Sequence, residues 1–98
     1  MGEGEAGPSP LVSYGLALLP ATRRELNALH DPERSRVSAA LDRLGDEPRH
    51  TGVRKLTGFR DLYRARVGHL RLVFRIDDAA RLVTVAAIGP RREIYRRL

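Results

Sequence analysis

The chain has 98 residues, enough for one domain with a modest hydrophobic core. Charged residues make up 31% of the sequence and hydrophobic residues 42%, and the absence of cysteine excludes disulfides, thiolate metal sites and cysteine nucleophiles. No apolar run approaches the roughly 18 residues of a membrane span, and the first residues lack the pattern of a signal peptide. We therefore expect a cytoplasmic protein without a membrane partner.

The formal net charge of +6 is unevenly distributed along the chain. Residues 1–48 hold five basic and eight acidic residues, a net charge of −3, whereas residues 49–98 hold thirteen basic and four acidic residues, a net charge of +9. Every basic residue except Lys55 is arginine, which suits bidentate phosphate binding. A GC-rich genome would also favour arginine, but it does not account for the clustering. The basic half predicts one face that binds an anion, most often nucleic acid or an acidic protein.

The first half of the chain predicts a strand and two helices. Residues 1–10 are rich in Gly, Pro and Ser and predict a disordered tail, which leaves a single domain over residues 11–98. Alternating apolar residues predict a strand over 14–18, and Pro20 suits the first turn of a helix. A second helix is expected from an Asp31 cap and Pro32 to about residue 44.

The second half predicts strands. Residues 49–60 are expected to form a connection, and apolar patterns predict strands over 63–67, 70–76 and 82–88. The fold class is therefore α+β with the order β-α-α-β-β-β, an antiparallel sheet with both helices packed on one face.

A two-residue turn at Gly68-His69 fixes the partners in the first hairpin. It places Arg66 opposite Arg71 and Arg64 opposite Val73, on the face away from the helices. Directly opposed like charges destabilise a sheet, so this pairing predicts an anion, with phosphate the obvious candidate, between two guanidiniums. The alternative is a solvated basic face whose arginine stems cover the sheet.

The next hairpin extends the predicted site. A four-residue loop at 77–80 predicts that Arg71 faces Ala86 and that Arg91 and Arg92 emerge at the same end of the sheet. The predicted site is a concave basic patch of Arg64, Arg66, Arg71 and Arg91, with Tyr95 near its rim. Metal and cofactor are not expected, because His30, His50 and His69 are isolated from carboxylates and from one another.

Four segments resemble the RelE/ParE superfamily, the toxins of bacterial type II toxin–antitoxin systems. They are KLTG at 55–58, LYRARVG at 62–68, LRLVFRI at 70–76 and IGPRREIY at 88–95, and the resemblance covers residues 14–97. No single segment is specific, so the ordered set carries the resemblance. The ending with Arg91 and Tyr95 is more similar to the RelE branch.

The resemblance implies a RelE-like, microbial RNase-type fold and a ribosome-dependent mRNA endonuclease. Such an enzyme cuts mRNA in the ribosomal A site by attack of a 2′-hydroxyl on the adjacent phosphate, without metal. By position, Arg71 would stabilise the charged phosphorane, Arg91 the leaving 5′ oxygen, and Tyr95 would orient the nucleotide. Further substrate-binding residues by position are Lys55, Arg75, Arg92 and His69.

Arg64 and Arg66 depart from the family pattern, which has lysines there that help to activate the 2′-hydroxyl. Arginine effectively cannot lose a proton, so both are expected to clamp phosphate. The general base is then His69, Tyr95 or a group of the ribosome. The implied partners are a cognate antitoxin, the ribosome and mRNA, with operator DNA bound only through the antitoxin complex.

Two other functions stay open at this point. A ParE-like inhibitor of DNA gyrase would not need the set of Arg71, Arg91 and Tyr95, whereas nuclease chemistry would. A toxin-fold protein with weak or lost activity that mainly binds its antitoxin is suggested by the missing lysines, and it would cause no growth arrest when produced alone.

Overall fold

The computed structural model describes residues 13–90 and Ile94. Its elements follow the predicted order with one additional strand, and the predicted tail at residues 1–10 lies outside the described part. In chain order they are β2 (Gly15–Leu18), α2 (Pro20–Ala28), α3 (Glu33–Asp46), β3 (Val53–Lys55), β4 (Leu62–Val67), β5 (Leu70–Asp77) and β6 (Leu82–Pro90).

The five strands form one sheet in the order β2-β6-β5-β4-β3. All neighbours are antiparallel except β2, which runs parallel to β6, so the expectation of a wholly antiparallel sheet is wrong for the first strand. The alternation of apolar and polar residues identifies a strand, but it does not show whether the strand pairs in parallel or antiparallel with its neighbour. That direction is set by the path of the chain between the two strands. The predicted connection at 49–60 contains the edge strand β3, whose three residues are too few for a periodic signal.

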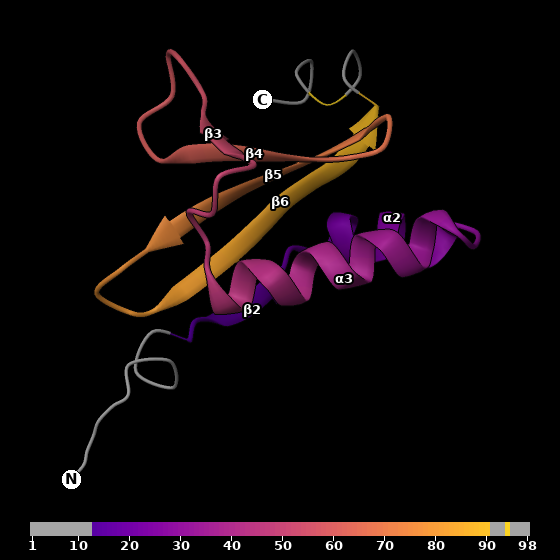
Figure 1. Cartoon of the computed structure of the whole chain (residues 1–98), viewed down its shortest axis with the longest axis horizontal. Coiled ribbons are helices and arrows are strands. Elements are labelled where there is room, and N and C mark those ends of the chain that lie inside the picture. Colours follow the sequence, from indigo (N-terminus) through magenta and orange to yellow (C-terminus); the bar gives the residue numbers. More distant parts are fainter. Residues whose placement is uncertain (1–12, 91–93, 95–98) are drawn as a thin grey trace, which may run out of the picture.

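Both helices cover one face of the sheet, as predicted (Figure 1). Pro20 occupies the first turn of α2, where its missing N–H costs no hydrogen bond. Helix α3 buries Val37, Leu41 and Leu44 against the sheet, the i, i+4, i+7 stripe of an amphipathic helix. The cap predicted at Asp31 is wrong, because α3 begins at Glu33 without a side-chain cap.

The first hairpin has the predicted register. Gly68 has φ of +61°, a conformation that glycine adopts without strain, and it forms the two-residue turn with His69. Arg66 lies opposite Arg71 and Arg64 lies opposite Val73. Tyr63 and Phe74 stack on the helix-covered face, with ring centroids 6.1 Å apart.

The second hairpin differs from its prediction. Asp77 pairs with Leu82, so the loop spans residues 78–81, and a bulge between Val73 and Phe74 shifts the register further. Arg71 therefore lies opposite Gly89 instead of Ala86. The cause lies in β6, a nearly continuous apolar strand whose sequence does not show where the alternation is interrupted.

A second, smaller apolar cluster lies on the sheet face opposite the helices. It consists of Leu62, Val73, Ala87 and Ile94, with Leu56 packed against it. Ile94 is fully buried there, so a residue beyond β6 contributes to this face. No helix in the described part of the chain is long and apolar enough to cross a membrane.

Candidate nucleic-acid interface

Five arginines of the described strands lie on the sheet face that carries the smaller apolar cluster, and four of them form two opposed pairs. Along each strand these arginines alternate with residues that point to the other face and pack into the core beneath the helices. Leu62 and Val73 of the smaller cluster lie on the same face as the arginines of β4 and β5. We call the four paired residues the arginine face, and it consists of Arg54, Arg64, Arg66 and Arg71.

The arginine face contains two consecutive rows of directly opposed like charges. Arg66 in β4 faces Arg71 in β5, and Arg64 in β4 faces Arg54 in β3. Opposed residues in adjacent strands have Cβ atoms about 4.5–5.5 Å apart, and like charges there destabilise the pairing. An anion lying between the guanidiniums reverses the sign of that interaction, because each guanidinium can donate two parallel hydrogen bonds to it.

Arg71 is the buried member of the face. It is 9% exposed, and it is one of the two polar residues in the buried core, the other being Thr22, among the residues described. Its partner in β6 is Gly89, which has no side chain. Within residues 13–90 and Ile94, no carboxylate forms an ion pair with Arg71. A buried cation without a carboxylate partner is unusual in a structural role and suits a binding site for an anionic group.

The other members of the face are more accessible. Arg64 is half-buried and Arg66 and Arg54 are exposed. The exposure of the arginines therefore increases from Arg71 in β5 to Arg54 in the edge strand β3. A long anion can lie across β5, β4 and β3 and contact all of them.

Three predicted substrate-binding residues lie away from the paired rows. Arg75 is exposed on the same sheet face, four residues from Arg71 and thus about 13 Å along β5. Lys55 pairs with Tyr63 and belongs to the opposite phase of β3, toward the helix-covered face. His69 Nε2 lies 3.1 Å from a carboxylate oxygen of Glu33, at the start of α3.

The remaining predicted site residues, Arg91, Arg92 and Tyr95, lie outside the described residues. Strand β6 ends at Pro90, opposite Leu70 and next to the Gly68 turn. The chain thus leaves the sheet at the end that carries Arg66 and Arg71.

Arg54 is the one member of the arginine face that was not predicted from the sequence, because it falls within the segment 49–60 that was predicted to be a connection.

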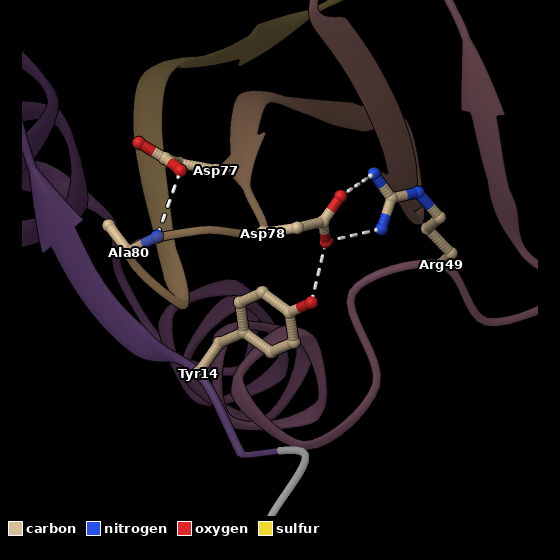
Figure 2. Close-up of polar contacts among 5 residues, drawn as sticks. All are labelled: Tyr14, Arg49, Asp77, Asp78 and Ala80. Carbon is tan, nitrogen blue, oxygen red and sulfur yellow. Dashed lines mark hydrogen bonds and ion pairs between the residues drawn. The ribbon is translucent and has the colours of Figure 1, made fainter.

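The strongest electrostatic interactions of the described residues lie at the other end of the sheet (Figure 2). Arg49 donates two hydrogen bonds to Asp78, at 2.8 and 3.0 Å, and the Tyr14 hydroxyl donates a third at 2.6 Å. The hydrogen bonds from Arg49, and then that from Tyr14, lower the pKa of Asp78 to about 2. The Asp78 carboxylate in turn raises the pKa of both Tyr14 and Arg49.

This network has a structural role. It joins the loop after β5 to the start of β2 and to the segment after α3, and the Arg49 guanidinium also lies 5.4 Å from the centre of the Tyr63 ring. Asp78 follows Arg71 by seven residues, so Asp78 lies about 23 Å from Arg71 along the strand direction. Among the described residues, no three His, Asp or Glu side chains gather as metal ligands.

Comparison with known families is consistent with this geometry. The sequence model of the family described as "ParE toxin of type II toxin-antitoxin system, parDE" matches residues 18–95, which include every strand of the sheet except most of β2. The chain belongs to the RelE/ParE toxin superfamily. It is therefore a toxin of the type II toxin–antitoxin class. Among curated proteins, none matches the chain.

Solved structures of RelE toxins share the fold of this RelE/ParE toxin. The isolated E. coli RelE toxin is 26% identical, with a TM-score of 0.72, and the match covers 87% of this chain and 94% of that one. RelE in an archaeal RelE–RelB complex from Pyrococcus horikoshii is 27% identical, with a TM-score of 0.70 and coverage of 81% and 96%. A toxin–antitoxin complex from Mycobacterium tuberculosis gives 26% identity, a TM-score of 0.70 and coverage of 81% and 99%. The family description is thus ParE, whereas these structures are RelE, and two of the three contain an antitoxin.

Proposed function

We propose that this toxin is a ribosome-dependent mRNA endonuclease that cuts in the A site and thereby inhibits translation in the cytoplasm. The observation that carries the proposal is Arg71, a buried guanidinium opposite another arginine and beside a glycine, without a carboxylate partner among the described residues. Such a site is complementary to a phosphate, and more strongly to a phosphate on which negative charge increases during reaction.

The reaction that fits this site needs no group beyond the RNA and a base. The 2′-oxygen of one nucleotide forms a bond to the adjacent phosphorus, the bond from phosphorus to the 5′-oxygen breaks, and a 2′,3′-cyclic phosphate and a 5′-hydroxyl result. Arg71 stabilises the charge on the phosphorane, and Arg66 and Arg64 clamp its oxygens. The 2′-hydroxyl proton leaves to a base other than these arginines, since guanidinium effectively does not deprotonate. The leaving 5′-oxygen takes up a proton from that protonated base or from water, so the proton count balances. The need for a 2′-hydroxyl selects RNA over DNA.

The proposal also includes a cognate antitoxin as the partner that blocks the site. Its support is that relatives were crystallised as RelE–RelB complexes, and that an acidic segment would be attracted to the opposed arginines of this face.

The test is a bacterial cell-free translation reaction with purified toxin, in which mRNA ends are mapped by primer extension. We expect cuts in the A-site codon that require ribosomes, and a decrease in rate of about 10²–10³-fold for Arg71→Ala, the usual effect of losing one donor to a developing oxyanion. Arg36→Ala is the matched control, because it removes the same charge from the exposed surface of α3. Uncut mRNA with wild-type toxin, or full activity of Arg71→Ala, contradicts the proposal.

A second candidate function is inhibition of DNA gyrase, which the ParE description of the matching family favours. Gyrase supercoiling assays with the same three proteins separate the two functions. Loss of supercoiling that persists in Arg71→Ala, together with intact mRNA, would support gyrase as the target.

A further inference from the structure

Arg54 extends the arginine face beyond the groups that the proposed chemistry uses. It lies in the edge strand β3, directly opposite Arg64, and its side chain is exposed. Within residues 13–90 and Ile94, no carboxylate forms an ion pair with it. Arg54 and Arg64 thus form a second pair of directly opposed arginines, next to the pair of Arg66 and Arg71.

The two rows are separated by a distance that suits successive parts of one RNA strand. Adjacent strands lie about 4.8 Å apart and two residues along a strand span about 6.7 Å, so Arg54 and Arg71 have Cα atoms about 12 Å apart. A stacked strand advances about 3.4 Å per nucleotide. When a phosphate occupies Arg71 and the strand crosses β4 toward β3, a phosphate about three to four nucleotides away lies over Arg54.

We propose that Arg54 binds a backbone phosphate of the RNA outside the bond that is cleaved, whereas Arg64 stays with the reacting phosphate. This inference rests on the proposed endonuclease function and adds a second phosphate site to it. Arg54 is a binding residue that sets the path of the strand and takes no part in bond breaking. A groove of cations that follows the backbone is how single-stranded nucleic acid is commonly held, with affinity that falls as salt rises.

The first experiment measures RNA binding without cleavage. The probe is a fluorescent single-stranded RNA of about twelve nucleotides with 2′-O-methyl groups throughout, which removes the nucleophile, and the salt range is about 50–200 mM. We expect Arg54→Gln to weaken binding by about fivefold, the upper range for an exposed ion pair. We also expect the slope of log affinity against log salt to decrease by about 0.7, the value for one phosphate contact on a single strand.

Two variants accompany Arg54→Gln in this assay. Arg36→Gln on α3 removes the same charge far from the sheet face and should bind as the wild type does. Arg54→Lys keeps the charge, so it should restore the salt slope. Thermal unfolding of Arg54→Gln should match or exceed that of wild type, because the opposed pair is relieved, and this excludes misfolding as the cause. Equal affinity and slope for Arg54→Gln and Arg36→Gln, or no wild-type binding at the lowest salt, would overturn the inference.

The second experiment separates this inference from the proposed function. In the ribosomal cleavage assay, Arg54→Gln should raise KM with kcat unchanged, whereas Arg71→Ala should lower kcat. Cleavage by wild type together with unaltered RNA binding by Arg54→Gln refutes the Arg54 site alone. Absence of cleavage together with the expected loss of RNA binding refutes the endonuclease function and leaves the phosphate site standing.

Discussion

Replacing Arg71 by methionine should make the protein more stable while removing its activity. Arg71 is 9% exposed and lies opposite Arg66. Removing a buried charge eliminates a desolvation penalty of several kcal/mol, part of which the remaining exposure already relieves. Removing the opposed charge contributes about 0.2–1 kcal/mol more, and the unbranched methionine can occupy the volume of the arginine stem. We expect the free energy of unfolding to rise by about 1–2 kcal/mol.

The assay is urea unfolding at pH 7 and low salt, accompanied by thermal unfolding. For a domain of this size, each kcal/mol corresponds to about 4–8 °C in Tm, so the expected shift is readily measured. Arg36→Met on the exposed surface of α3 is the control and should stay within about 0.5 kcal/mol of wild type. A decrease of more than about 1 kcal/mol in Arg71→Met would refute the reasoning, because it would show that the guanidinium makes favourable contacts in the free toxin.

The effect of phosphate on the Tm is a second, independent test of whether Arg71 binds an anion. Inorganic phosphate that occupies the site stabilises the folded state by mass action, so the Tm of wild type should rise with phosphate concentration. Arg71→Met experiences the same general salting effect but lacks the site, and its Tm should rise less. Parallel curves for the two proteins would show that Arg71 does not bind phosphate in the free toxin.

Three further predictions concern the scaffold. The pKa of Asp78 is about 2, below its ordinary value of 3.8, because Arg49 donates hydrogen bonds to the carboxylate. These hydrogen bonds therefore stabilise the fold above pH 3.8, and the stabilisation is lost as the pH falls toward 2. In urea unfolding across that pH range, the free energy of unfolding of Asp78→Asn should depend less on pH than that of wild type. Gly68→Ala, at φ of +61°, should cost about 1–2 kcal/mol in thermal unfolding without changing the pattern of cleavage sites. Glu25→Ala should cost about 1–3 kcal/mol because it leaves the Ile88 N–H without its carboxylate acceptor, and amide exchange at Ile88 should accelerate.

Local signals predicted the parts of the fold that depend on neighbouring residues. Pro20 marked the start of α2, the stripe of Val37, Leu41 and Leu44 marked the buried side of α3, and Gly68 fixed the register of the first hairpin. Each of these is decided within a few residues of the chain, by backbone conformation or by the spacing of apolar side chains.

The errors arose where distant residues decide the structure. The loop of the second hairpin begins one residue later than predicted, which moves the partner of Arg71 by two residues, and the bulge in β6 moves it by one more, from Ala86 to Gly89. A run of apolar residues gives no indication of where such an interruption falls. Strand β3 is short and gains its place by pairing with β4, so Arg54 remained hidden in a predicted connection. The fold class and three of the four residues of the arginine face were therefore accessible from sequence, whereas the burial of Arg71 and the place of Arg54 needed the three-dimensional structure.

The site was nevertheless indicated by a violation of the rules that predicted the scaffold. Natural sequences agree with their folds at most positions, and departures concentrate where function requires them. A sheet selected for stability alone would place a neutral or acidic residue opposite Arg71, yet this one places Arg66 there and repeats the arrangement at Arg54 and Arg64. The opposed pair of Arg66 and Arg71 costs stability in the free protein and gains it when an anion binds. In the proposed function the same arrangement binds RNA, and an acidic partner that covers the face would both silence and stabilise the toxin.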